Sequence, residues 1–228
     1  MKRSEINAAI QLALDTLQRH QFHLPPFAHW SAKEWESVRE ESERIRINGL
    51  GWDITDFGSG KFDAIGAVLF TLRNGNVSEP AKGTPYAEKL IIFKPGQCIP
   101  FHFHWVKTED IINRGGGVLC VQLFNALPDD SIDTVTPVEI FCDAVRRTVQ
   151  PGEKLELQPG ESITLTPRTY HNLFAAEDKG VLICGEVSSV NDDSVDNRFA
   201  EPTSRFADIE EDEIPLRLLC NEYPPCKG

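Results

Sequence analysis

The sequence is short of positive charge. Its 228 residues include 23 Lys and Arg against 35 Asp and Glu, for a formal net charge of −12 at pH 7. A general binder of nucleic acid or of an anionic membrane needs a basic face, so this balance argues against both partners. It does not exclude a local basic pocket.

Long apolar runs are also missing. The longest, such as residues 64–72, fall far short of the roughly 20 residues that cross a membrane. At the N-terminus, Glu5 and Asp15 interrupt any hydrophobic signal segment. We therefore expect a soluble, cytoplasmic protein.

The six cysteines include no C-x-x-C pair, which argues against a zinc ribbon or a thioredoxin-like redox pair. In a reducing compartment, scattered cysteines within apolar segments are expected to be structural thiols. Internal repeats and low-complexity segments are absent. The ordinary hydrophobic content of 40% leaves ample material for the core of one sizeable domain.

The N-terminal region has helical periodicity. A first helix is expected to begin near Ser4 and to end before Pro25, because proline cannot continue a helix. Its apolar positions have the spacing of one helical face: Ile6, Ala9, Ile10, Ala13, Leu14 and Leu17. A second helix is expected from Ser31, where Ser31 and Glu34 form a capping box, to about Asn48.

After Gly51 the segments become short and rich in β-branched and aromatic residues, with Gly and Pro between them. About eleven strands without alternating helices predict a sandwich or barrel rather than a βαβ sheet. The expected strands are 52–57, 64–72, 88–93, 97–104, 117–124, 138–143, 145–149, 154–157, 162–165, 171–175 and 181–187. The acidic run 208–213 is interpreted as a solvated face.

His102 and His104 stand at i and i+2 in an extended segment, so both side chains share one face of a strand. Glu109 follows five residues later, beyond a bend or on the return strand, and His171 lies on another expected strand. Three imidazoles and one carboxylate suit Mn²⁺, Fe²⁺, Co²⁺, Ni²⁺ or Zn²⁺, and an octahedral ion would keep two positions open. An H-x-H pair alone is weak, because paired surface or packed histidines are common. The other histidines, His20, His23 and His29, are interpreted as non-ligands.

The spacing of Gly96, His102, His104, Glu109 and Gly116 resembles the first cupin motif at every fixed position. The second motif is matched more loosely: Gly160 and His171 have the right separation, but 167–170 departs from the usual turn. More closely, the chain resembles the D-lyxose isomerases over almost its full length, including HFHWVKTEDIINRGGG at 102–117 and VNDDSVDNRF at 190–199.

This resemblance implies a mainly β cupin barrel, a double-stranded β-helix or jelly roll, with an N-terminal helical extension. Residues 1–50 would pack on the barrel of 51–228, with its acidic C-terminal segment, in a single domain. The resemblance further implies a homodimer that uses Mn²⁺ to interconvert D-lyxose and D-xylulose, with D-mannose and D-fructose as a slower pair. The residues that match the family's metal ligands are His102, His104, Glu109 and His171.

Aldose–ketose isomerisation needs either a base that moves a proton between C2 and C1 or a direct hydride shift, with two substrate oxygens near a cation. Besides Glu109, the catalytic candidates are Lys107, as a cation for a sugar oxygen, and Glu186, as the base. The non-functional alternatives are that Lys107 is a solvated lysine and that Glu186 is a surface charge at the end of a strand. A bend after His104 would be needed to bring Lys107 to the histidine face.

Sugar contacts are expected from a strand start and a polar loop, since loops at a barrel rim often carry such contacts. The substrate-binding candidates are Lys89, Asp193, Asp196 and Arg198. Two other functions stay open. A cupin dioxygenase uses the same ligand set but wants an apolar oxygen pocket, and a non-catalytic cupin would bind sugar without forming ketose.

Overall fold

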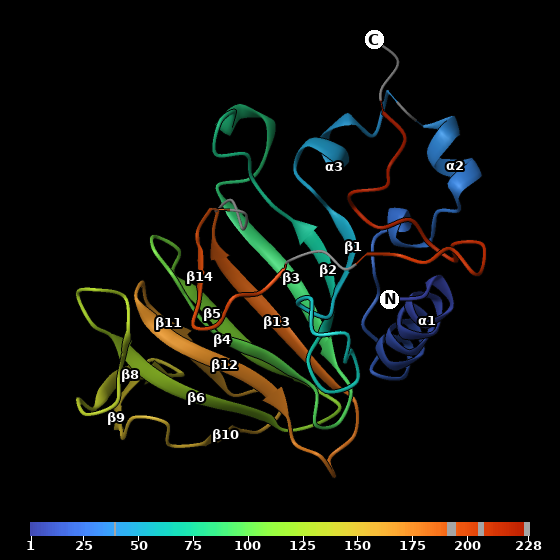
Figure 1. Ribbon diagram of the computed structural model, residues 1–228. Helices are drawn as coiled ribbons and strands as arrows, with labels where there is room; N and C mark the ends of the chain where they lie inside the picture. The colour runs from blue at the N-terminus through green and yellow to red at the C-terminus, as the bar shows by residue number, and fades with distance from the viewer. Residues whose placement is uncertain (39, 191–194, 205–207, 226–228) are drawn as a thin grey trace.

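Two β-sheets form the body of the chain in a computed structural model that describes residues 1–38, 40–190, 195–204 and 208–225 (Figure 1). The eight-stranded sheet has the order β1 (Gly51–Thr55), β2 (Ala67–Arg73), β3 (Tyr86–Phe93), β13 (Leu182–Ser189), β5 (Glu109–Gly115), β11 (Ser162–Leu165), β8 (Val138–Cys142) and β9 (Val145–Val149). The six-stranded sheet has the order β10 (Leu155–Leu157), β6 (Leu119–Ala126), β12 (Thr169–Ala175), β4 (Cys98–His104) and β14 (Asn197–Phe199), with β7 (Ile132–Asp133) paired to β6.

The main core lies between these sheets. Alternating side chains of β6, such as Val121 and Leu123, pack in one buried cluster with Ile111 and Ile163 of the opposite sheet. Period-2 alternation places one face of each strand in this cluster. The expected mainly β, cupin-like fold is confirmed, and each of the eleven expected strands is present with small differences at its ends.

Helix α1 (Arg3–Arg19) covers the outer face of the eight-stranded sheet, beside β1 and β2 (Figure 1). Its apolar stripe, including Ile6, Ile10 and Leu17, joins Phe70 and Ile92 in a second buried cluster. The strands beneath the helix are therefore buried on both faces. Within the described ranges, no helix is both long and apolar enough to cross a membrane.

The second expected helix is interrupted. After the short helix η1 (Pro26–His29), α2 spans Ala32–Ser37, with the expected capping box of Ser31 and Glu34, and α3 spans Glu43–Ile47. Between α2 and α3, the Ser42 hydroxyl donates to the carbonyl oxygen of Val38. Such local side-chain bonds compete with continued helix formation and favour an interruption here. Apolar periodicity does not register this competition, and so it predicted one longer helix.

The acidic side chains of 208–213 are exposed, as expected for a solvated face, but two of them also contact the start of α1. The Asp212 carboxylate accepts from the backbone and hydroxyl of Ser4 at 2.9 and 2.7 Å, and Glu211 pairs with the buried Arg3 at 2.6 Å. Arg3 also pairs with Glu222. The Asp212 carboxylate thus satisfies one free N–H group at the start of α1 and lies near the positive end of the helix dipole.

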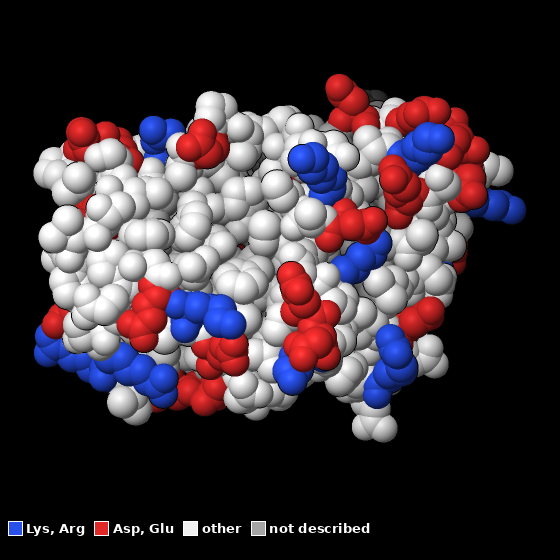
Figure 2. Space-filling view, turned by 60° about the horizontal axis from the view of Figure 1, so that its bottom comes forward, with Lys and Arg blue, Asp and Glu red and all other residues white. Residues whose placement is uncertain are grey.

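Figure 2 shows one face of the molecule with a wide uncharged area. Basic side chains are scattered among acidic ones, and the described residues drawn there form no broad basic patch.

Candidate active site

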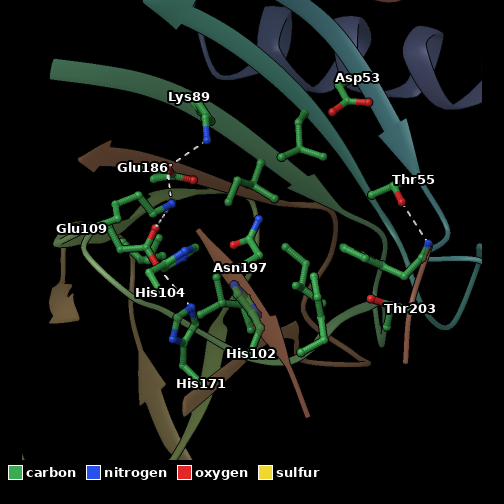
Figure 3. Close-up of a pocket in the computed structure, with 18 residues that line it drawn as sticks. Asp53, Thr55, Lys89, His102, His104, Glu109, His171, Glu186, Asn197 and Thr203 are labelled. Atoms are coloured by element: carbon green, nitrogen blue, oxygen red, sulfur yellow. Dashed lines mark hydrogen bonds and ion pairs between the residues drawn. The ribbon is translucent and has the colours of Figure 1, made fainter. Parts of the chain in front are cut away.

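Three histidines converge at one end of the space between the sheets. His102 and His104 lie on the same face of β4, and β12 pairs with β4 so that His171 stands opposite His102 (Figure 3). One ligand atom from each of the three rings lies within 4.8 Å of the others, and all three side chains are buried. The cluster can therefore share one metal ion.

The backbone fixes the orientation of these rings. Each turns its Nδ1 towards a carbonyl oxygen: His102 to Pro100 (2.9 Å), His104 to Asp196 (3.1 Å) and His171 to Thr169 (2.9 Å). Because a carbonyl only accepts, we assign the proton of each ring to Nδ1. Each Nε2 then has a free lone pair, the form that binds metals.

Two of these lone pairs face another acceptor. Nε2 of His171 and of His104 lie 3.1 and 3.3 Å from Oε1 of Glu109, and both nitrogens are buried without a hydrogen-bond partner. Acceptors this close repel each other unless a proton or a metal ion lies between them. Three imidazole nitrogens and one carboxylate oxygen fit a divalent first-row metal.

The protonation states agree with this donor set. Burial lowers the pKa of His102 well below its ordinary value, and the neighbouring rings of His171 and His104 lower it further. For Glu109, burial alone would raise the pKa, but the Lys107 ammonium beside the carboxylate opposes this and the pKa is held well below its usual range. The site therefore offers a neutral imidazole at His102 and an ionised carboxylate at Glu109.

Four buried charged groups lie beside the histidines. Nζ of Lys107 lies 2.7 Å from Oε2 of Glu109 and 3.0 Å from Oε1 of Glu186, and Nζ of Lys89 lies 3.3 Å from the same Glu186 oxygen. We call Lys89, Glu186, Lys107 and Glu109 the ion-pair chain. Strand β4 ends at His104 and β5 begins at Glu109, so the chain turns between them and brings Lys107 to the histidine side.

The three histidines and the ion-pair chain line one cavity of about 340 Å³. They line one part of it, and Ile91, Ile99 and Leu173 line its apolar walls. Asp53 and Thr55 of β1 lie on the side away from the histidines, Thr203 lies below Thr55 in this view, and Asn197 lies between Thr55 and the histidines (Figure 3). The cavity therefore presents charged groups at one end and a mixture of polar and apolar side chains elsewhere.

The structure thus brings together most of the predicted site residues. Lys89 lines the cavity, but Asp196 and Arg198 are not among its lining residues. The Asp196 carboxylate accepts from backbone N–H groups, and the exposed Arg198 donates to the carbonyl oxygen of Phe199. Asp193 lies outside the described residues. Sugar contacts by these last three residues stay predictions.

Several lining residues were missed by sequence reasoning. Asn197 and Phe199 belong to β14, which pairs with β4 and stacks the Phe199 ring on His102 with centroids 5.2 Å apart. The signal for β14 is only three residues long. Asp53 and Thr55 had a clearer signal, since they are polar residues that alternate with the apolar Trp52 and Ile54 in one strand, and the structure buries all of them.

Comparisons with known proteins agree with this geometry. The sequence model of one family, described as D-lyxose isomerase, matches residues 1–223. A D-lyxose/D-mannose isomerase from Serratia proteamaculans is 46% identical over 224 residues, 98% of each chain. A protein of the same description from Escherichia coli O157:H7 is 45% identical over 229 residues, again 98% of each chain.

Solved structures resemble the fold at lower identity. Ligand-free L-ribose isomerase from Cellulomonas parahominis has a TM-score of 0.56 at 17% identity, covering 89% of this chain and 94% of that one. A mutant L-ribose isomerase from Acinetobacter sp. DL28 with L-ribose has a TM-score of 0.59 at 14% identity, covering 92% and 98%. The full-length match to the family model and to relatives at this identity shows that the chain belongs to the D-lyxose isomerase family.

Proposed function

We propose that the protein is a metal-dependent aldose–ketose isomerase that interconverts D-lyxose with D-xylulose and D-mannose with D-fructose. The observation that carries the proposal is the joint placement of two features in one cavity. Three imidazoles and Glu109 form a donor set, and Glu186 lies beside it between two lysines. Membership of the family supports the choice of substrates.

The donor residues would hold the metal through the Nε2 atoms of His102, His104 and His171 and a Glu109 oxygen. A divalent ion bound there supplies Lewis acidity, which polarises the two adjacent oxygens of an open-chain sugar. We propose Mn²⁺ as this ion. The donor set by itself also accepts the neighbouring first-row metals, and availability decides among them.

Glu186 is the group best placed to act as the base. Its carboxylate lines the cavity and is buried, so a proton that it accepts is shielded from water. It would take the proton from C2 of the aldose, the C2–H electron pair would form the enediolate, and the same carboxyl would return the proton to C1. A second proton moves from the O2 hydroxyl to O1, which completes the ketose.

The lysines balance charge during this transfer. The Lys107 ammonium reaches Glu186 and Glu109, and it can donate to a sugar oxygen that becomes negative. Lys89 compensates the Glu186 carboxylate from the other side. Asn197, Thr203, Thr55 and Asp53 then supply donors and acceptors for the remaining hydroxyls, in a cavity of a size that suits a small ligand.

The test is a ketose assay on protein stripped with a chelator and reloaded with Mn²⁺. We expect ketose from D-lyxose and D-mannose only after reloading, and we expect His102→Ala to lose both bound metal and turnover. No ketose from any aldopentose or aldohexose would overturn the proposal. Oxygen uptake with substrate would indicate a dioxygenase, and sugar binding without ketose would indicate a binding protein.

The homodimer and the cytoplasmic location implied by the resemblance stay predictions, as does the division into a helical extension and a barrel. Light scattering on the purified protein measures the first. A monomer mass at micromolar concentration would contradict it.

A further inference from the structure

Asp196 lies immediately before β14, and its side chain is buried although it does not line the cavity. Its two carboxylate oxygens accept from consecutive backbone groups: Oδ1 from the N–H of Val106 at 2.9 Å and Oδ2 from the N–H of Lys107 at 3.1 Å. Hydrogen bonds to an ionised acceptor are stronger than neutral ones. One buried carboxylate therefore holds the turn between β4 and β5.

This turn connects two parts of the active site. His104 ends β4, Glu109 starts β5, and Lys107 between them places its ammonium on two carboxylates. The backbone carbonyl oxygen of Asp196 also accepts from Nδ1 of His104 at 3.1 Å. A residue about ninety positions away in sequence thus contacts the turn through its side chain and a ligand ring through its backbone.

We propose that Asp196 is a positioning residue, whose carboxylate fixes the backbone of Lys107 and thereby the place of the Lys107 ammonium between Glu109 and Glu186. The Lys107 side chain is held in one position, because its Nζ contacts the Glu109 and Glu186 carboxylates at 2.7 and 3.0 Å. Displacements near 1 Å in a catalytic group cost about 100-fold in rate. The inference rests on the proposed function, in which Lys107 stabilises charge on the substrate.

Asp196→Asn separates the two contacts. The amide keeps the shape of the side chain and one accepting oxygen, but its NH₂ group faces the other backbone N–H, so donor meets donor. The backbone contact to His104 remains, so the metal site keeps its ligand orientation. We expect kcat to fall about 10- to 100-fold, as for other residues that orient catalytic groups. The KM for D-lyxose and the Kd for Mn²⁺ should stay within about twofold, since neither sugar nor metal loses a contact.

Asp133→Asn is the control for loss of a carboxylate charge. The Asp133 carboxylate, at the end of β7, accepts from the backbone N–H groups of Val135 and Thr136 at 2.8 and 3.0 Å, both on Oδ1, so the asparagine oxygen can keep both bonds. We expect its kcat, KM and Mn²⁺ affinity to equal those of the wild type. Urea unfolding of both variants shows how far each carboxylate serves stability alone.

The outcomes are distinct. A raised KM with unchanged kcat would overturn the proposal in favour of a direct sugar contact. A loss of kcat that follows weakened Mn²⁺ binding, or an Asp196→Asn protein that does not fold, would show a structural role and overturn it too. If the wild type is active and Asp196→Asn has the same kcat as Asp133→Asn, this proposal alone is refuted. Absence of ketose from the wild type would refute the proposed function together with it.

Discussion

Replacing Lys107 by methionine removes the ammonium that stands between two buried carboxylates. Glu186 keeps Lys89 at 3.3 Å, but no second lysine contact is seen at Glu109 among the described residues. In the metal-free protein, Glu109 then faces only the two imidazole nitrogens, at 3.1 and 3.3 Å. A buried carboxylate without a compensating charge is costly.

The magnitude follows from the contacts. At an effective dielectric constant of 20, each of the two Lys107 contacts has a Coulomb energy of about 6 kcal/mol, most of which is offset by desolvation. Measured losses on breaking a buried pair are about 3–5 kcal/mol. Because Glu186 retains a partner, we expect the lower end, about 3 kcal/mol of unfolding free energy. A bound divalent ion compensates Glu109, so the loss should be smaller in the presence of Mn²⁺.

Linkage turns this difference into a binding prediction: Lys107→Met should bind Mn²⁺ at least as tightly as the wild type, while kcat falls. Urea unfolding with a chelator and with Mn²⁺, together with calorimetric titration, measures each quantity. Lys154→Met is the control, because Lys154 makes an equally short contact to Glu156, at 2.7 Å, but on the surface. Metal-free Lys107→Met as stable as the wild type, or a loss undiminished by Mn²⁺, would refute the reasoning.

The remaining predictions concern the base, a ligand and the helix anchor. Glu186→Gln should lower kcat at least about 100-fold while calorimetry shows unchanged Mn²⁺ affinity, because Glu186 is outside the donor set; retained turnover would exclude it as the base. His171→Gln should weaken Mn²⁺ binding more than about 10-fold in the same titration; wild-type affinity would show that His171 is not a ligand. Arg3→Met should lower the unfolding free energy by about 2 kcal/mol, measured in urea, since the partly buried Glu222 carboxylate loses its ion pair with Arg3. A change in kcat, measured with Mn²⁺, would contradict a purely structural role for Arg3.

Several features that depend on neighbouring residues in the sequence were predicted correctly. Strand alternation places His102 and His104 on one face, and the capping box of Ser31 correctly marks the start of α2. The meeting of His171 with this pair depends on the pairing of β12 with β4, which no local pattern specifies. There the resemblance to the cupin motifs supplied the missing information.

Other features depend on contacts between distant segments. The acidic run has the composition of a solvated face, and its contacts with Arg3, Ser4 and Asn7, about two hundred positions away, show that part of it anchors α1. Strand β14 is too short to stand out, yet it covers β4 and brings Asn197 into the cavity. The turn between β4 and β5 likewise depends on Asp196, which is distant in sequence. Strand alternation along β4 could therefore not predict the direction of the Lys107 side chain.

The central claim is that Glu186 carries a proton between adjacent carbons of the sugar at this metal site. It is tested most directly by isomerisation in D₂O, followed by NMR of the D-lyxose and D-xylulose recovered after many turnovers. We predict deuterium at C2 of the aldose and C1 of the ketose, accumulating slowly because the carboxyl is shielded, and none of it with Glu186→Gln. Full equilibration between the two sugars with no deuterium on carbon would contradict the claim and indicate a direct hydride shift.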